Sequence, residues 1–401
     1  MMQITDLKEE QKILPIFRLG FRPFFLGGAV FSIIAIALWV LLYRGVVSFS
    51  PYGNGNWWHI HEMIFGFGSA IVAGFLLTAV QNWTGIPSIK GKPLAALFLL
   101  WLLGRVVMLV PDLLGTTLSA LIDLSFLLTV VYTLAKPILV IKQYRNLFFV
   151  PLLVLFTIAN GEMHLATIYP RHVSLNYSGY AGVLLVVFLM SVMSGRVIPM
   201  FTANGTQTTK AKPSPLLDKL ANGSLLLATL MLLLHPLVGF VPMFFGAILI
   251  VAGLFQLIRS LRWRPWITLG VPLLWSLHLA IKFMWFGLIL LGFSYIVDDI
   301  PSNHAWHILT IGGIGGMILA MISRVSLGHS GLPLTPPKLM SVAFALITLS
   351  SMVRVFGPWF MPEKTMMFID ISGFCWLIAF GLFIFYYGPM LFKAREDGRP
   401  G

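Results

Sequence analysis

Long apolar stretches constrain this chain more than any other feature. A helix needs about 20 apolar residues to cross about 30 Å of hydrocarbon, and runs of that length recur from end to end. They are too continuous for the alternating strands of a membrane barrel. The sequence therefore predicts an all-α integral membrane protein with about 12 transmembrane helices. The predicted spans are 21–43, 57–80, 94–110, 113–135, 147–168, 177–200, 216–235, 239–258, 268–296, 304–324, 338–357 and 366–390.

The composition supports the same class. Charged residues make up 10% of the 401 positions and hydrophobic residues 58%, whereas a soluble domain carries about a quarter charged residues. The single cysteine, Cys375, excludes a disulfide framework, a CxxCH haem attachment and a cysteine-ligated iron–sulfur cluster. Any metal chemistry would therefore use His, Met, Tyr or carboxylate side chains. No linker marks a second domain, so residues 1–401 are expected to form one polytopic domain.

The basic residues predict the orientation. With the N-terminus in the cytoplasm, 21 of the 27 Lys and Arg residues fall in or beside inner segments, as the positive-inside rule expects. This distribution predicts a bacterial inner membrane protein with both termini cytoplasmic. It also explains the net charge of +13 without a nucleic-acid partner. The charged N-terminal segment does not resemble a cleavable signal peptide.

Seven of the nine histidines fall near the periplasmic ends of the predicted spans. A single His at a helix end usually meets water or a lipid headgroup, but seven on one face suggest cofactor ligands. Histidine is the commonest side chain for haem and copper. His278 and His329 lie on the inner side. The seven are His59, His61, His164, His172, His235, His304 and His307.

The spacing of the paired histidines limits how they can act. His304 and His307 share a helix face at i, i+3, whereas His59 and His61 point about 200° apart. Placed on the tenth span without gaps, the second span aligns His61 with His307 and Gly66 with Gly312. Glycines follow both histidines; close helix packing is their commoner role, and room for a flat macrocycle is the alternative. A period of about 120–125 residues would give three four-helix units.

Several other polar residues lie at membrane depth and are functional candidates by default. Glu62 follows the first His pair, and Glu162 precedes His164 by two residues. Either carboxyl could carry protons. Arg105 and Asp123 lie in the third and fourth spans. Ion pairing between helices is the structural alternative for these groups, and Arg105 could instead extend outward to the headgroups.

Short motifs across the chain resemble the NnrS family of haem- and copper-containing bacterial membrane proteins. They are Phe17 to Phe25 (FRLGFRPFF), Trp58 to Met63 (WHIHEM), Asn160 to His164 (NGEMH), Ser194 to Pro199 (SGRVIP) with Asn204-Gly205, His304 to His307 (HAWH) and Gly328 to Gly331 (GHSG). The resemblance implies haem b, copper and a role with nitric oxide in denitrification or nitrosative stress.

The resemblance also brings an analogy with the haem–copper oxidase catalytic subunit. That subunit has twelve helices in a pseudo-threefold arrangement, with haem-ligating His on the second and tenth. On this analogy His59, His61, His304 and His307 would bind haem. The sixth span here has no His, so copper would take its ligands from His164, His172, His235 or His278.

Three functions remain open. The first is an oxidoreductase that binds and reduces nitric oxide at a periplasmic-side site within the membrane. Glu62 or Glu162 would then supply protons, and quinol or a periplasmic carrier the electrons. The second is a non-enzymatic nitric oxide sensor or sink. The third is a secondary transporter, for which the intramembrane charges would form the ion path.

Overall fold

The computed structural model describes residues 7–169 and 175–401 and is helical throughout the membrane-spanning part. Twelve helices in the described residues are long and apolar enough to cross a bilayer, which confirms the predicted class and number of spans. The prediction of two separate spans at 216–235 and 239–258 is also confirmed, because α10 and α12 are distinct helices joined by the short α11.

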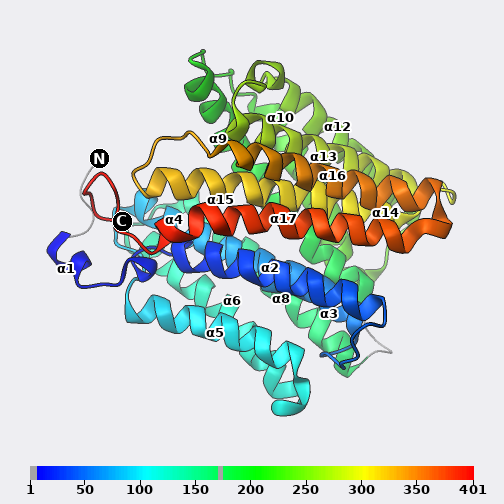
Figure 1. Cartoon of the computed structure of the whole chain (residues 1–401). Coiled ribbons are helices and arrows are strands. Elements are labelled where there is room, and N and C mark those ends of the chain that lie inside the picture. The colour runs from blue at the N-terminus through cyan, green and yellow to red at the C-terminus, as the bar shows by residue number, and fades with distance from the viewer. Residues whose placement is uncertain (1–6, 170–174) are drawn as a thin grey trace. The chain divides into compact units, whose positions relative to one another are not determined.

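The first half of the chain supplies six spans (Figure 1). Short helices precede or join them: α1 (Leu7–Gln11), η1 (Pro15–Phe17), η3 (Pro111–Leu113) and α7 (Tyr144–Leu147). The spans are α2 (Phe21–Tyr43), the continuous α3 (Gly55–His61), η2 (Glu62–Gly68) and α4 (Ser69–Thr84), then α5 (Lys92–Leu109), α6 (Gly115–Val140), α8 (Phe149–Ile168) and α9 (Leu175–Thr206).

The second half supplies the other six spans. Its short helices are α11 (His235–Val238), η4 (Pro265–Thr268) and η6 (Pro362–Lys364). The spans are α10 (Pro215–Leu233), α12 (Pro242–Leu261), α13 (Pro272–Ser294), the continuous α14 (Ser302–His307), η5 (Ile308–Gly315) and α15 (Gly316–His329), then α16 (Lys338–Phe360) and α17 (Thr365–Leu391).

The chain divides into two compact units. Unit 1 contains the described residues up to Gly182 together with 324–334 and 383–401, and unit 2 contains 183–323 and 335–382. In unit 1, α2 packs against α4 and η2, while α6 packs against α4, α5 and α8. In unit 2, α13 packs against α12 and η5, and α16 packs against η5.

The helices of unit 1 place apolar side chains on their outer faces and polar ones inside. In α5, Leu99, Leu102 and Val106 are exposed, whereas Trp101 and Arg105 on the opposite face are buried. A helix of a soluble protein has the reverse pattern. The arrangement fits a bundle that is surrounded by lipid and keeps its few charges inside.

The first four spans and the last four repeat one order of elements. Each set runs from a short 3-10 helix through one span to a second span interrupted by a π-helical segment, and then through two more spans joined by a 3-10 turn. The π segments η2 and η5 begin directly after His61 and His307. The structure therefore supports the alignment of the second and tenth spans. The described part of α9 has no such segment.

Candidate metal centre

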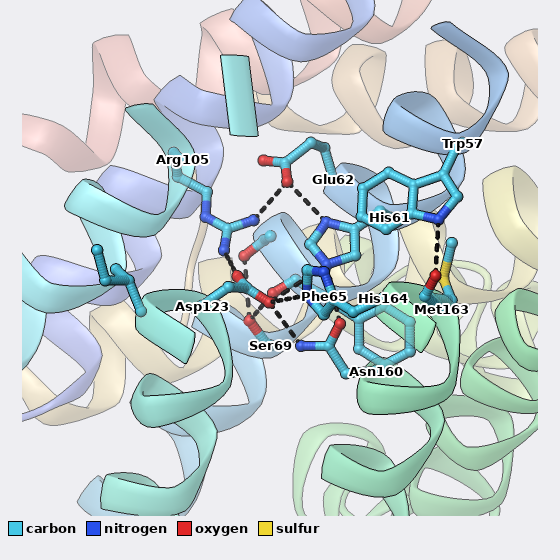
Figure 2. Close-up of polar contacts among 12 residues, drawn as sticks. Trp57, His61, Glu62, Phe65, Ser69, Arg105, Asp123, Asn160, Met163 and His164 are labelled. Atoms are coloured by element: carbon cyan, nitrogen blue, oxygen red, sulfur yellow. Dashed lines mark hydrogen bonds and ion pairs between the residues drawn. The ribbon is translucent and has the colours of Figure 1, made fainter. Parts of the chain in front are cut away.

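Six polar side chains meet inside unit 1 and form what we term the His61 cluster (Figure 2). They come from four spans, and each lies about 6–12 Å from the same end of the helices at a rise of about 1.5 Å per residue. All six are buried. The members are His61 at the end of α3, Glu62 at the start of η2, Arg105 in α5, Asp123 in α6, and Asn160 and His164 in α8.

Arg105 joins the two carboxylates of the cluster. Its Nη1 donates to Glu62 Oε1 at 2.6 Å, and its Nη2 donates to Asp123 Oδ1. The guanidinium also lies 6.0 Å from the centre of the Phe31 ring. Ion pairing between helices is therefore confirmed for Arg105, and its extension toward the headgroups is wrong, because the side chain is buried.

Both ring nitrogens of His61 have partners. Nδ1 lies 2.8 Å from Glu62 Oε1, while Nε2 lies 2.8 Å from Asn160 Oδ1. The ring stacks on Trp57 with centroids 4.4 Å apart and planes 12° apart. The Trp57 indole N–H donates to the Met163 carbonyl oxygen at 3.1 Å. His61 is thus fixed in position and orientation by its own span and by α8.

Asp123 Oδ2 lies between the two imidazoles. It is 3.2 Å from His61 Nε2 and 3.2 Å from His164 Nε2, and it accepts from Asn160 Nδ2 at 2.7 Å. His61, Asp123 and His164 each place one ligand atom within 4.8 Å of the others. Metal bonds of about 2.1 Å place neighbouring donor atoms about 3.0–3.4 Å apart. The spacing therefore suits a single transition-metal ion.

The chemistry of these donors narrows the choice of metal. Two imidazoles and one carboxylate suit copper, iron, zinc or nickel better than magnesium or calcium, which prefer sites of oxygen alone. The formal charges of the cluster also indicate that one further positive charge is needed. Glu62 and Asp123 outnumber Arg105 by one charge when the imidazoles are neutral, and a buried charge needs a partner. A metal cation or one proton on the cluster would balance it.

Tyr52 closes the cluster from the loop between α2 and α3. Its ring lies edge-on to the His164 ring, with the ring centroids 5.2 Å apart. The centroid of the Trp57 ring lies 4.9 Å away. Burial, and then the negative charge of Asp123, raise the pKa of the Tyr52 phenol to about 12. The loop thus covers the cluster with a phenol that stays uncharged at physiological pH.

The structure places the two histidines of the first pair in different surroundings. An axial ligand must direct one nitrogen at the iron, with room beside it for the macrocycle. Both His61 nitrogens are bonded to protein groups, and Trp57 covers the ring. His59 stacks instead on Trp39, with centroids 4.6 Å apart and planes 11° apart. None of these contacts tests the prediction that His59 and His61 bind haem, and it stays a prediction.

The other predicted ligands that the structure describes belong to unit 2. In unit 2, the His304 ring stacks parallel to Trp359 at 6.1 Å, and His307 Nδ1 lies 2.6 Å from the Asn303 carbonyl oxygen. The rings of His235 and Phe240 have their centroids 4.9 Å apart. His278 Nε2 lies 2.9 Å from the Thr202 hydroxyl. His172 is outside the described residues.

Glu162 is also apart from the cluster. It stands two residues from both Asn160 and His164 on α8, so it points to a different side of the helix. Its Oε2 atom is buried and has no hydrogen-bond partner. Of the two predicted catalytic carboxylates, the structure therefore brings only Glu62 to the cluster.

Sequence reasoning left Arg105, Asp123 and Asn160 out of the site. Arg105 and Asp123 were recognisable as charges at membrane depth, but their partner was ambiguous. Asn160 and His164 stand one helical turn apart and so share a face of α8. That spacing was the available signal for a two-residue contribution from α8.

Together these features define a polytopic membrane protein with a buried His–Asp–His set supported by a charge network. A comparison with protein families matches residues 15–395 to the family described as NnrS protein. The match covers nearly the whole chain, and the chain belongs to the NnrS family. A search of curated proteins found no match to it.

Proposed function

We propose that this protein binds nitric oxide at a copper ion held by His61, Asp123 and His164, and that it reduces the gas there. The observation that carries the proposal is the 3.2 Å spacing of both imidazole Nε2 atoms from Asp123 Oδ2. The family is linked to nitric oxide and to metal cofactors, and nitric oxide is small, uncharged and soluble in lipid. A buried site within the bilayer suits such a ligand.

Bound copper would supply an open coordination position and one-electron redox chemistry. The residues around the site hold the metal ligands in position and exclude water. Arg105 holds Asp123 and Glu62 in fixed positions, and Asn160 Nδ2 donates to Asp123 Oδ2 and directs that carboxylate. Such outer contacts orient metal ligands and tune their basicity. Trp57 and Tyr52 cover the imidazoles and exclude water.

Glu62 is the proposed proton donor. Its Oε1 atom contacts both His61 and Arg105, whereas its Oε2 atom is buried without a hydrogen-bond partner. A proton on Oε2 would therefore cost no existing contact. Reduction of two nitric oxide molecules to nitrous oxide and water consumes two protons and two electrons. Glu62 would deliver the two protons one after the other, and quinol or a periplasmic carrier would supply the electrons.

The haem prediction for His304 and His307 stays a prediction, and no step of the proposed reaction uses haem. A nitric oxide sink differs from a reductase in one measurable respect: it binds the gas without forming nitrous oxide when a reductant is present. A transporter would need no metal in the cluster.

The test is metal analysis and electron paramagnetic resonance of the purified protein from cells supplied with copper, iron and haem precursor. Stoichiometric copper, with a spectrum that nitric oxide changes, is expected. His164→Ala should lose the copper, because it removes one of three protein ligands. His235→Ala, which changes a His outside the cluster, is the matched control and should keep it.

Two results would overturn the proposal. One is a wild-type protein that folds but contains no copper under these conditions. The other is equal copper content in the wild type and His164→Ala. Nitrous oxide formation by the copper-loaded protein with an added reductant then separates a reductase from a sink.

A further inference from the structure

Basic residues gather in two loops of unit 2, at the end of its helices that is expected to face the cytoplasm. One loop, residues 207–214, joins α9 to α10, and the other, residues 262–271, contains η4 and joins α12 to α13. We term these two segments the basic loops. Together they hold four Lys or Arg residues and no Asp or Glu, and the four are Lys210, Lys212, Arg262 and Arg264.

Hydrogen bonds hold the basic loops against each other. Arg264 Nη2 donates to the Thr209 carbonyl oxygen. Arg262 Nη2 donates to the Lys212 carbonyl oxygen at 3.5 Å. Lys210 stands between the two accepting residues in the chain, so the first loop is attached to the second on both sides of it. The two loops therefore form one surface.

The positive charge of this surface is not balanced by an acidic side chain. Lys210, Lys212 and Arg262 are exposed, and none of them forms an ion pair within the described part of the chain. The acidic residue nearest to them in the sequence is Asp218, whose Oδ1 accepts from Arg259 Nε at 2.6 Å. Arg259 is buried, and a buried charge needs its partner. The carboxylate of Asp218 is thus already used inside the unit.

Apolar side chains are exposed directly beside the basic loops. Trp266, within the second loop, is 61% exposed, and Leu216, in the first turn of α10, is 69% exposed. A row of exposed side chains on α12 also ends immediately before Arg262. The members of this row are Leu254, Ile258 and Leu261, which share one helix face at i, i+4 and i+7. A ligand at this surface therefore meets positive charge at the helix ends and apolar side chains along the helix.

These two features together select the chemical class of the ligand. Clusters of Lys and Arg beside a span attract anionic headgroups, and exposed Trp and Leu side chains suit the boundary with hydrocarbon. A free phosphate compound would use only the charges, and a neutral lipid would use only the apolar side chains. An anionic phospholipid uses both. The general excess of basic residues on one side of a membrane protein does not explain why these two loops are bonded together beside an exposed tryptophan.

We infer that the basic loops bind the headgroup of one anionic phospholipid. Its phosphate lies against Lys210, Lys212 and Arg262, and an acyl chain follows the exposed row of α12. Trp266 lies at the level where headgroups meet hydrocarbon. The inference uses no residue of the His61 cluster and does not depend on the proposed function.

Lipid titration of the purified full-length protein in detergent, followed by native mass spectrometry, tests the site. The wild type should bind its first phosphatidylglycerol more tightly than phosphatidylcholine. Lys210→Gln combined with Lys212→Gln should weaken phosphatidylglycerol binding about 25-fold, because each basic residue near an anionic lipid surface contributes a factor of about five. Lys142→Gln combined with Arg145→Gln is the matched control. It removes the same charge from exposed positions between α6 and α8 of unit 1 and should keep the wild-type affinity.

Three results would overturn the site. They are equal affinity of the wild type for the two lipids, unchanged affinity in the basic-loop variant, and equal losses in the two double variants. Glycerol 3-phosphate, which has the phosphate without acyl chains, separates a lipid from a free phosphate compound. It should leave bound phosphatidylglycerol in place, and displacement at equal concentration would overturn the assignment to a lipid. Thermal midpoints of both double variants should match the wild type, since all four substitutions are at exposed positions.

Discussion

Arg105 contacts both carboxylates of the His61 cluster, so its positive charge offsets part of their negative charge inside unit 1. The guanidinium is the one full positive charge among the six cluster residues when both imidazoles are neutral. Glu62 and Asp123 are buried beside it, and no water in the bilayer core can replace it. The contribution of Arg105 to stability is therefore best measured by a neutral replacement, which leaves the two buried carboxylates without a positive partner.

Arg105→Met should destabilise the protein by about 3–5 kcal/mol, because it leaves two buried carboxylates without their partner. Thermal unfolding in detergent measures the change. Arg145→Met, at an exposed position, should leave the midpoint near that of the wild type. Adding Asp123→Asn to Arg105→Met should recover part of the loss. A double variant no more stable than Arg105→Met would contradict this electrostatic explanation.

His61 and His164 illustrate how far the sequence alone could place the site. Histidines near one end of several spans were visible, and the neighbouring Glu62 was visible with them. The sequence could not show that His61 and His164 converge while His59 turns to Trp39. Their convergence depends on how α3, α6 and α8 pack, and a helix with an apolar surface all round gives little information on its rotation.

Tyr52 gives a pH-dependent prediction. Its pKa is about 12 in the folded protein against 10 for an ordinary tyrosine, so the folded state binds the proton more tightly. Below pH 10 both states are protonated and the full stability is present. Between pH 10 and 12 the unfolded state loses its proton first, and stability falls as the pH rises.

The loss should reach about 3 kcal/mol at most, at a pH above 12. Tyr52→Phe should remove this part of the alkaline destabilisation. Denaturant or thermal unfolding at several pH values, with wild type and variant compared, measures it. Parallel stability curves for the two proteins between pH 8 and 12 would refute the prediction.

At the scale of elements, the π segments explain how a span can carry a charged cluster. A π segment adds a residue to a helical turn and displaces the side chains that follow, and such segments are frequent at functional sites. Glu62 begins η2, and Gly66 within it leaves room for the Arg105 guanidinium and the Glu62 carboxylate. The glycines of this span were read from the sequence as close packing or cofactor space, and close packing is what Gly66 provides.

Gly66→Ala should therefore disturb the cluster. The added methyl group would lie within 3.0 Å of Arg105, Glu62 and Phe31, and overpacking of this kind costs about 1–3 kcal/mol. Gly68→Ala is a control in the same segment, because its methyl group would meet only the Met63 carbonyl oxygen at 3.5 Å. Thermal midpoints and copper content measure both effects. Equal losses in the two variants would show that helix propensity, not the cluster, decides the outcome.

At the scale of the whole molecule, the repeat preserves the backbone and changes the chemistry. The aligned histidines and glycines made the second and tenth spans recognisable in the sequence. The replacement of Glu62 by Ile308 removes one charge from the second repeat.

The two ends of the chain meet on one side of unit 1. Arg22, at the start of α2, donates to the Leu391 carbonyl oxygen at 2.9 Å and to the Lys393 carbonyl oxygen at 2.7 Å, just beyond α17. An even number of spans requires this arrangement. The excess of basic residues in the segments on that side predicts that it faces the cytoplasm.

Fusions at the C-terminus should test the orientation. Green fluorescent protein joined after Gly401 should fluoresce, and alkaline phosphatase at the same point should be inactive, because each folds only in its own compartment. Alkaline phosphatase inserted in the loop after Tyr43 should be active. The His61 cluster lies toward the helix ends on that loop's side, so these results would place it near the periplasm. An active phosphatase after Gly401 would reverse the orientation, and electrons from a periplasmic carrier could then no longer reach the cluster directly.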